Sequence, residues 1–282
     1  MRRGNSMRTL MVKKIIILFI VCCLSSVVCG CGSSFHFSRQ SFLKLPQDEL
    51  YNIVPAKHEL RVGEKLTYEI KWMGIPVAIA VFSVKEIVQI NGRDCYHVEA
   101  LVKTNAFLSK IYKVTDEFHS YIDKEKLYSL RFAKKQSEGK YRSDEVNDYD
   151  QDKHTGNYRS LRNDSTKNFT LTENIQDDLS SIYYFRMQDI SIGKQVVMNV
   201  NADGNNWILS IDVLQKGCMK IYRIGKLDAI EVEPRARTIE GKTLDKGRLW
   251  IWFGADENRI PLAAKANAAI VGTVSAVLID VK

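Results

Sequence analysis

Alternation of polar and apolar residues is the feature of this sequence that most restricts its fold. The stretch KLTYEIKW alternates four polar residues with Leu66, Tyr68, Ile70 and Trp72. A repeat of two places the apolar side chains on one face of an extended strand, whereas a helix would need a repeat of about 3.6. Similar stretches recur to the end of the chain, so the sequence predicts a mainly β fold.

Turn residues divide these stretches into separate strands. Asn91-Gly92 is the strongest short signal for a hairpin, and it joins strands predicted over residues 77–90 and 95–104. The polar span 150–167 is predicted to be a hairpin end or a mobile loop. Further strands are predicted over residues 65–72, 118–121, 127–132, 141–149, 195–200, 207–214, 219–224, 229–233, 249–253 and 268–281.

A helix is predicted near the middle of the chain. Asp177 or Asp178 can cap a helix that ends at Met187, and its apolar residues lie along one side. Neither an internal repeat nor a linker divides residues 61–282. We therefore expect one β-rich domain over these residues: a single antiparallel curved sheet or barrel-like domain with one or two short helices.

The first 30 residues have the pattern of a secretory signal peptide. Lys13-Lys14 precede an apolar run of fourteen residues, Ile15–Val28, which is shorter than the roughly 20 residues that span a bilayer. The tetrad Val28-Cys29-Gly30-Cys31 resembles the lipobox of bacterial lipoproteins, in which a small residue precedes the acylated cysteine. We predict a lipoprotein signal peptide over residues 1–30 and attachment of palmitate or a similar chain to Cys31. Ordinary secretion with cleavage elsewhere is the alternative.

This N-terminus also predicts a location. Two or more acyl chains hold a protein to a bilayer far better than one, so the protein is expected to be anchored without spanning the membrane. Gly32 follows the cysteine, and no acidic run comes before Asp48. Signals for inner-membrane retention and for surface export are thus missing, which favours the outer membrane facing the periplasm. Residues 31–60 are interpreted as a tether or approach segment.

The net charge gives no indication of nucleic-acid binding. Residues 1–30 carry five basic residues and no acidic one, so without them the formal charge falls from +8 to +3. Nucleic-acid binding needs basic residues gathered on one face, and no such cluster stands out. Four of the six cysteines belong to the signal and anchor. The other two, Cys95 and Cys218, are expected either to form a disulfide or to remain buried free thiols.

Several stretches together resemble one protein family. They are GEKLTYEIKWMGIPVAIAVFSV (63–84), TNAFLSKIYKVTDEFHSYID (104–123), DDLSSIYYFR (177–186), LWIWFGADENRIPL (249–262) and the last strand with Gly272 and SAVL (275–278). In this order they resemble the domain-of-unknown-function family 3108, exported bacterial proteins of which many are lipoproteins. The resemblance covers about residues 60–282. It implies a mainly β, curved or barrel-like sheet, similar to envelope lipoprotein carriers, and supplies no catalytic residue.

Complete motifs for catalysis, metal binding or cofactor binding are missing from the sequence. His97-Val98-Glu99 resembles half of a zinc deaminase motif, but the required cysteine pair does not follow. On a strand His97 and Glu99 share a face, which is interpreted as a hydrogen-bonded pair. The five histidines show no metal-ligand spacing. The sequence therefore favours a protein that is not an enzyme and holds no metal or cofactor.

The stretch LWIWFGADENR is the most suggestive for ligand binding. Trp250 and Trp252 share one face of the predicted strand, and its other face is apolar as well. A central strand covered on both sides explains this pattern, since buried aromatic residues usually belong to a core. The functional alternative is a groove in which aromatic rings hold sugar faces or acyl chains. The candidate ligand-binding residues are Trp250 and Trp252, with Trp72 and Tyr68 on another strand.

These observations favour a non-enzymatic, lipid-anchored envelope protein that binds a hydrophobic ligand, a glycan or an envelope partner. Its expected partners are the membrane, through the lipid anchor, and a lipid or glycan, with no nucleic acid. Two alternatives remain. One is a structural or assembly protein of the envelope without a small-molecule pocket. The other is a glycan or lipid hydrolase that uses acids such as Asp116, Glu117 or Asp256.

Overall fold

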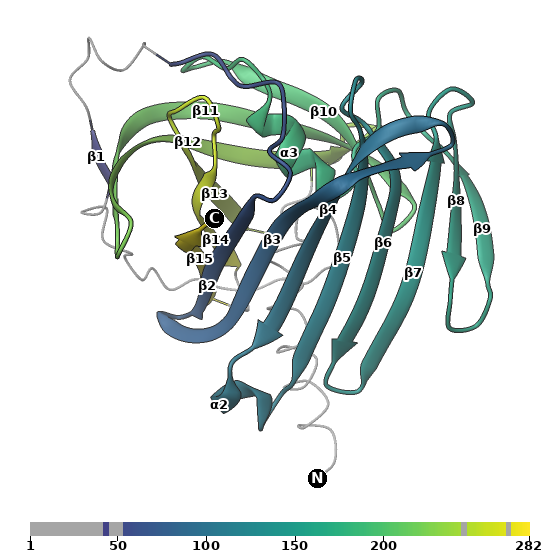
Figure 1. Ribbon diagram of the computed structural model, residues 1–282, viewed down its shortest axis with the longest axis horizontal. Helices are drawn as coiled ribbons and strands as arrows, with labels where there is room; N and C mark the ends of the chain where they lie inside the picture. Colours follow the sequence, from purple (N-terminus) through teal and green to yellow (C-terminus); the bar gives the residue numbers. More distant parts are fainter. Residues whose placement is uncertain (1–41, 45–52, 244–246, 269–271) are drawn as a thin grey trace.

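The structure is a computed structural model that describes residues 42–44, 53–243, 247–268 and 272–282 (Figure 1). The predicted signal peptide and the predicted acylation site Cys31 lie outside these residues. None of the described helices is long and apolar enough to cross a membrane. The structure is mainly β, with 64% of the described residues in strands, and the predicted fold class is confirmed.

All fifteen strands in the described residues belong to one antiparallel sheet. Strands β2 to β9 are neighbours in chain order, and so are β11 to β15. The last strand, β15, pairs with β2, which joins the two runs into one wall. The strands are β1 (Phe42–Lys44), β2 (Lys65–Trp72), β3 (Ile75–Ile90), β4 (Arg93–Thr104), β5 (Val114–Asp123), β6 (Ser129–Glu138), β7 (Tyr141–Asp150), β8 (Thr155–Ser160), β9 (Thr166–Thr170), β10 (Gln195–Ala202), β11 (Asn205–Ile221), β12 (Gly225–Thr238), β13 (Arg248–Gly254), β14 (Pro261–Ala268) and β15 (Gly272–Val281).

The sheet curves like a barrel, but its strand ladder does not close. One end of the sheet is β9, and the other is formed by β10 and β1, which both pair with β11. The segment after β9 crosses this gap. Gln176 forms a parallel bridge with Val200 of β10, while the carbonyl of Ile175 accepts a hydrogen bond from the Ser129 amide at the start of β6, 3.1 Å away. Backbone hydrogen bonds of this segment therefore connect β10 with β6.

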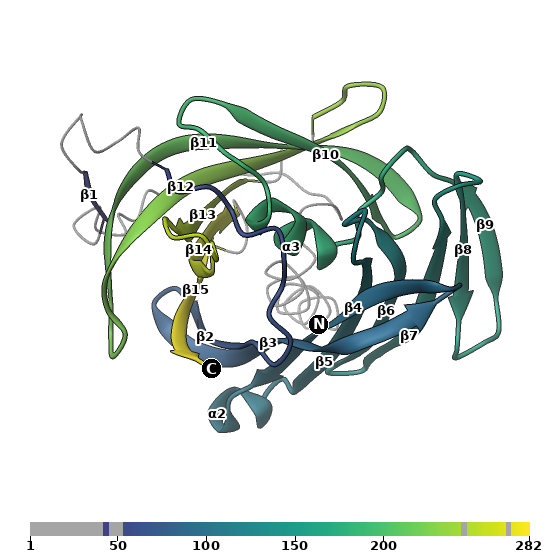
Figure 2. The same cartoon turned by 45° about the horizontal axis from the view of Figure 1, so that its top comes forward.

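The helix α3 (Ser180–Arg186) lies inside the curve of the sheet (Figure 2). Its start is fixed by Asp177, which is fully buried. One carboxylate oxygen accepts hydrogen bonds from the amides of Leu179 and Ser180, at 2.8 and 2.7 Å. The other accepts from the hydroxyls of Ser120 and Ser129, at 2.6 and 2.5 Å. Asp177 thus fastens the helix start to β5 and β6.

Helix α3 also divides the apolar interior. Tyr183 belongs to the larger core cluster, which includes residues of β2 to β6. Phe185 belongs to a second cluster between α3 and β10 to β13, where its ring lies 4.7 Å from the ring of Phe253. A short helix with apolar residues on both sides can fill a curved sheet that is too wide to be filled by its own side chains.

Several elements differ from the sequence-based prediction. The strands predicted over residues 207–214 and 219–224 belong to one strand, β11. The span 150–167, predicted to be a hairpin end or a mobile loop, contains β8 and the start of β9. Half of the residues of β8 are exposed, and the strand lacks an apolar stripe. Strand β14, PLAAKANA, was not predicted because alanine is a weak strand former. The one-turn helix α2 (Ala106–Ser109), between β4 and β5, was not predicted at this position either.

Candidate functional site

A partly enclosed apolar cavity of about 90 Å³ lies inside the curved sheet beside α3. Strands β2 and β3 form one side through residues that include Leu66, Tyr68 and Ile70, and β13 to β15 form another. Ile182 and Tyr183 of α3 complete the lining. The alanines of β14 and β15 leave the space that larger side chains would fill. This arrangement suits a ligand with an apolar portion.

Two residues of α3 that carry polar groups, Tyr183 and Arg186, are part of the lining. The hydroxyl of Tyr183 is buried and has no hydrogen-bond partner among the described residues. Burial raises the pKa of Tyr183 above its ordinary value, so the hydroxyl stays neutral and can donate. Arg186 also lines the cavity, and its guanidinium lies 5.1 Å from the Tyr183 ring. An unpaired buried hydroxyl costs free energy, and a polar group of a ligand or a water would remove that cost.

Tyr68 is the one candidate ligand-binding residue that the structure places in the cavity. Its hydroxyl donates to the carbonyl of Pro261 at 2.7 Å, which ties β2 to the start of β14. Its ring packs edge-on against Phe82, with 5.5 Å between centroids. Burial raises the pKa of Tyr68 well above its ordinary value. The ring is therefore a rigid, neutral part of the wall.

The three candidate tryptophans do not join Tyr68 in the cavity lining. Leu249 and Ile251 of β13 line it, so the alternating Trp250 and Trp252 lie on the opposite face of the strand. There the guanidinium of Arg248 lies 4.6 Å from the Trp250 ring. Trp72 packs against the larger core cluster. The prediction that Trp250 and Trp252 share a face agrees with the structure, but neither residue lines the cavity, and Trp252, like Trp72, packs against the larger core cluster.

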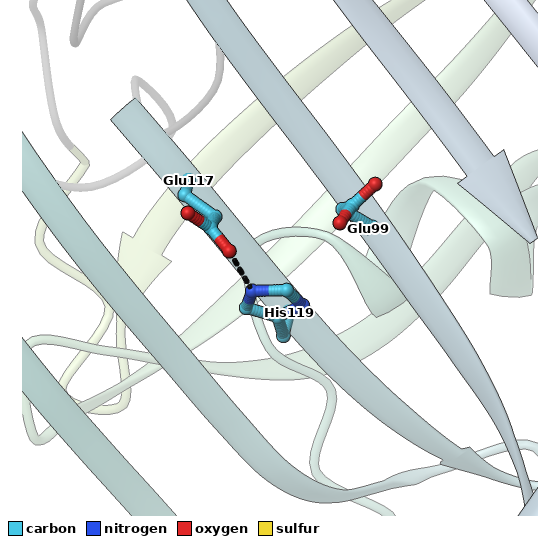
Figure 3. Close-up of side chains that lie close together, drawn as sticks. All are labelled: Glu99, Glu117 and His119. Carbon is cyan, nitrogen blue, oxygen red and sulfur yellow. Dashed lines mark hydrogen bonds and ion pairs between the residues drawn. The ribbon is translucent and has the colours of Figure 1, made fainter. Parts of the chain in front are cut away.

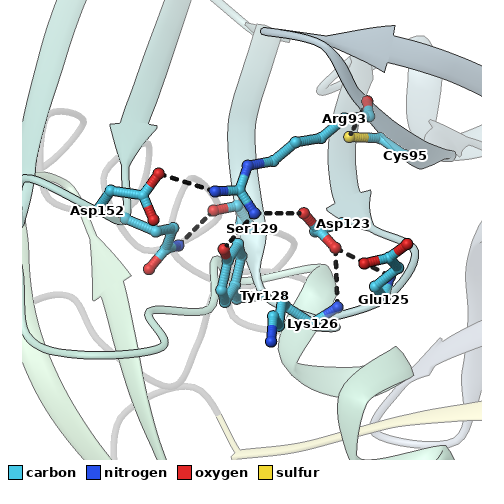
Figure 4. A network of polar contacts seen from close by, with 9 residues as sticks. Arg93, Cys95, Asp123, Glu125, Lys126, Tyr128, Ser129 and Asp152 are labelled. Carbon is cyan, nitrogen blue, oxygen red and sulfur yellow. Dashed lines mark hydrogen bonds and ion pairs between the residues drawn. The ribbon is translucent and has the colours of Figure 1, made fainter.

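Cys95 and Cys218 are both buried free thiols, so of the two alternatives the structure contains the thiols and not the disulfide. The two cysteines lie on β4 and β11, which are not neighbours in the sheet. Cys95 lies beside a polar network at the start of β4 (Figure 4). In this network Arg93 donates to Tyr128 at 2.9 Å and to Asp152 at 2.8 Å. Burial raises the pKa of the Cys95 thiol to about 11.

The acids proposed for the hydrolase alternative do not converge. Asp116 and Glu117 are adjacent on β5 and point to opposite faces. Asp116 is buried, whereas Glu117 is on the outer face beside His119. Asp256 lies in the turn after β13, where its carboxylate accepts hydrogen bonds from the backbone amides of Asn258 and Arg259, both at 3.1 Å. The arrangement of these three acids gives no pair of carboxylates around a common reacting atom.

Sequence reasoning missed one group of residues that could hold a metal ion. One oxygen each of Glu99 and Glu117 and one nitrogen of His119 lie within 4.8 Å of one another (Figure 3). Glu99 and His119 face each other across β4 and β5. The signal was present as two short patterns, His97-Val98-Glu99 and Glu117-Phe118-His119. Each pattern places its histidine and glutamate on one face of a strand, but only strand pairing brings the two together.

Comparisons with known proteins agree with the fold. A crystal structure from Brucella abortus, described as a beta-barrel-like protein of the domain of unknown function DUF1849, aligns with a TM-score of 0.51 and 10% identity. The alignment covers 78% of this chain and 97% of that one. The likeness shows a shared fold and nothing about activity.

Two further solved structures are more distant. One is a candidate exported protein with a YmcC-like fold from Bacteroides fragilis, with a TM-score of 0.33, 10% identity and coverage of 82% of this chain and 98% of that one. The other is a candidate lipoprotein from Parabacteroides distasonis, with a TM-score of 0.33, 9% identity and coverage of 81% and 100%. A TM-score of 0.33 does not establish a shared fold.

No curated protein matches the chain. The family described as "Protein of unknown function (DUF3108)" matches residues 67–279, which is nearly the whole of the described domain. The resemblance identified from the sequence is thus confirmed. The chain belongs to the DUF3108 family.

Proposed function

We propose that this is a lipid-anchored envelope protein that binds the apolar portion of a ligand between α3 and the curved sheet. The observation that carries the proposal is the apolar cavity, whose lining includes Tyr183, a residue with a buried hydroxyl that has no hydrogen-bond partner among the described residues. An apolar wall favours a ligand with a hydrocarbon portion. The hydroxyl favours one with an oxygen that can accept a hydrogen bond, as in an acyl ester or a fatty acid.

The size of the cavity restricts how the ligand binds. Pockets for drug-sized ligands have volumes of about 300–1,000 Å³, whereas this cavity has about 90 Å³. It therefore accepts a short part of a hydrocarbon chain while α3 keeps its position. A whole lipid would need α3 to move away from β2 and β3. Because Arg186 holds α3 in place, the proposal is binding of a chain end rather than enclosure of a complete lipid.

The proposed location depends on the N-terminal sequence. An acylated Cys31 would hold the domain at the membrane through the segment 31–60. The outer membrane facing the periplasm is the proposed site, because the residues after Cys31 carry neither of the signals that direct lipoproteins elsewhere. Metabolic labelling with a palmitate analogue tests this proposal: the analogue should mark the wild-type protein and should not mark Cys31→Ser.

Native mass spectrometry of protein purified from its own host tests the cavity. The wild-type protein should carry extra mass from a co-purified ligand. Ala264→Leu places three more carbon atoms in the lining and should remove that mass while the far-UV circular dichroism spectrum stays unchanged. The matched control is Trp250→Ala, which changes the face of β13 opposite the cavity lining and should leave the ligand bound.

The other outcomes discriminate between the alternatives. Loss of the ligand in Trp250→Ala but not in Ala264→Leu would place it on the aromatic face of β13 opposite the cavity lining, where a glycan can stack. A wild-type mass equal to that of the protein without a ligand would contradict the binding proposal and favour the structural or assembly role.

A further inference from the structure

A cluster of histidines and glutamates on the outer face of β3 to β5 lies away from the cavity. His119 is at its centre: its Nδ1 lies 2.9 Å from Nε2 of His97, and its Nε2 lies 2.8 Å from Oε1 of Glu117. Nδ1 of His97 lies 3.6 Å from Oε1 of Glu86. The ring of His97 stacks on Tyr121, with 4.7 Å between centroids. The imidazole rings of His97 and His119 are therefore held in fixed positions.

When both histidines are neutral and no metal ion is bound, the ring hydrogens cannot supply a donor for every contact in this cluster. If Nε2 of His119 donates to Glu117, its Nδ1 must accept a hydrogen from His97. Neutral His97 then points an unprotonated Nδ1 towards the Glu86 carboxylate. A cation bound at Nε2 of His119 reverses this chain. Nδ1 of His119 then donates to His97, and Nδ1–H of His97 points towards Glu86, so that each contact has one donor and one acceptor.

We propose that Glu99, Glu117 and His119 form a binding site for a divalent transition-metal ion of the Zn²⁺ class. One imidazole and two carboxylates, with a position left for water, is a ligand set that zinc accepts. His97 and Glu86 form the outer shell, which fixes the tautomer and orientation of His119. Ligand atoms around zinc lie roughly 3.3 Å apart, so small rotations of the glutamates complete the site.

The ammonium group of Lys85 lies beside this cluster and pairs with one of the proposed ligands, Glu99. Its Nζ lies 3.2 Å from Oε1 of Glu99, and 45% of its side chain is exposed. It can therefore turn into solvent when an ion binds, and its charge competes with the ion. This predicts effects of opposite sign: removal of His119 weakens binding, whereas removal of the Lys85 charge strengthens it.

Calorimetric titration of the full chain with Zn²⁺, and separately with Mg²⁺, tests the site. We expect one Zn²⁺ site whose affinity falls at least tenfold in His119→Gln and rises severalfold in Lys85→Met. His154→Gln, which changes a histidine in the turn between β7 and β8, is the matched control and should bind like the wild type. A Co²⁺-loaded protein should show a spectrum without a thiolate charge-transfer band, which distinguishes this site from cysteine ligands.

Equal Zn²⁺ affinity in the wild type and His119→Gln would overturn the proposal. Displacement of Zn²⁺ by an equal concentration of Mg²⁺ would overturn it as well, because a hard cation prefers an all-oxygen site. Thermal unfolding of each variant without metal verifies that it is folded. A thiolate band in the Co²⁺ spectrum that persists in His119→Gln would assign binding to the cysteines instead.

A second inference rests on one rim of the sheet. The β2–β3 turn, the α2 loop between β4 and β5, and the β6–β7 turn lie at the same end of the strands (Figure 1). Apolar side chains protrude from them: Phe107 is 72% exposed, Ile111 75%, Ile75 61% and Met73 51%. The loops support one another, since Asn105 donates to the carbonyl of Pro76 at 2.7 Å.

The charges of these loops all have one sign. Residues 73–77, 105–113 and 139–142 contain four basic residues, Lys110, Lys113, Lys140 and Arg142, and no acidic one. The turns at the opposite rim differ, since they mix acidic residues such as Glu125 and Asp152 with basic ones. Exposed large apolar residues among basic ones suit the interface of an anionic bilayer, where the apolar groups enter the headgroup region and the lysines stay beside the phosphates.

We infer that this rim docks on an anionic membrane surface. The full chain in vesicles that contain anionic lipid tests this by lysine labelling and mass spectrometry. Lys110, Lys113 and Lys140 should lose severalfold reactivity relative to vesicles of purely zwitterionic lipid. Lys124 and Lys126 at the opposite rim are the internal control and should not change.

The variant Phe107→Ser with Ile111→Ser should abolish the protection, while the labelling of Lys124 stays as in the wild type. Equal labelling of the rim lysines in both kinds of vesicle would overturn the inference. Protection that develops only when other envelope proteins are added would show that the rim binds a protein instead.

Discussion

Arg186 and Glu64 form a bidentate ion pair although 122 residues separate them in the chain, with Nη1–Oε1 and Nη2–Oε2 distances of 2.7 Å. Only 4% and 6% of their side chains are exposed. Arg186 ends α3, and Glu64 immediately precedes β2. Nε of Arg186 also donates to the carbonyl of Asn258 at 3.2 Å. Burial by itself would lower the pKa of Arg186, but the hydrogen bonds and charge of Glu64 outweigh burial and raise it.

Breaking this pair should destabilise the protein strongly. Glu64→Gln leaves the guanidinium buried without a counter-charge, and we expect a loss of about 3–5 kcal/mol in the free energy of unfolding. Urea unfolding followed by circular dichroism measures it. Replacing both partners, Glu64→Leu with Arg186→Met, should recover much of the loss. The control is Lys71→Ala in the partly exposed pair Glu69–Lys71, which should cost at most about 1 kcal/mol.

Asp177 should be the most sensitive residue at the start of α3. Asp177→Ala removes the acceptor of two amides and of the Ser120 and Ser129 hydroxyls, all of them buried. Each unsatisfied buried group costs about 1–3 kcal/mol, so we expect a loss of about 3 kcal/mol or more. Asp177→Asn keeps one acceptor oxygen and should lose less. Equal stability of the alanine variant and the wild type in urea unfolding would contradict this role.

Asp178 should make stability depend on pH. Burial, together with the charges of Asp203 and Asp177, raises its pKa well above the ordinary value, although Lys134 opposes the shift. The folded state therefore binds a proton more tightly than the unfolded chain does. The resulting stabilisation is complete below the ordinary aspartate pKa of about 4 and is lost as pH rises through the raised pKa.

Comparison of wild type with Asp178→Asn isolates this effect. The asparagine is neutral at every pH and avoids the cost of a buried carboxylate. The variant should be the more stable protein at pH 7, and the difference should vanish as pH falls towards 4. Unfolding by urea at a series of pH values measures it. A difference that stays constant with pH would show that Asp178 does not titrate in this range.

The thiol of Cys95 should be unreactive in the folded protein. Its raised pKa of about 11 keeps the thiolate fraction very small near pH 8, and burial blocks access. Iodoacetamide should leave the Cys95 peptide unmodified until a denaturant is added, as peptide mass spectrometry can determine. Without reductant, the peptides of Cys95 and Cys218 should appear as free thiols. A cross-linked pair of these peptides would contradict the structure.

The strand pattern was largely readable from the sequence because alternation is local. Strand β2 was predicted with the bounds that the structure gives it, residues 65–72. The signal failed where burial does not demand large apolar side chains. In β8, Gly156 packs under the ring of Phe169, so closely that an added Cβ would lie 2.2 Å from a ring atom. Strand β14 uses alanines because α3 and the cavity take up the space beside them.

The candidate sites were harder to predict because they depend on contacts between distant residues. Alternation showed that Trp250 and Trp252 share a face of β13. It did not show which face looks inward, because both faces are apolar. The curvature of the sheet and the position of α3 decided that Leu249 and Ile251 line the cavity. Likewise, the register of β4 against β5 brought Glu99 opposite His119.

By itself the sequence determined that the domain is an antiparallel β structure, since a repeat of two apolar positions stabilises only an extended strand with one buried face. Which face is buried, and against what, was decided by tertiary structure. The placement of α3 inside the sheet rests on Asp177 and on the Arg186–Glu64 pair, whose members are far apart in the chain. Interactions of this kind become favourable only once folding has removed water and brought both partners together, so no local pattern of residues encodes them.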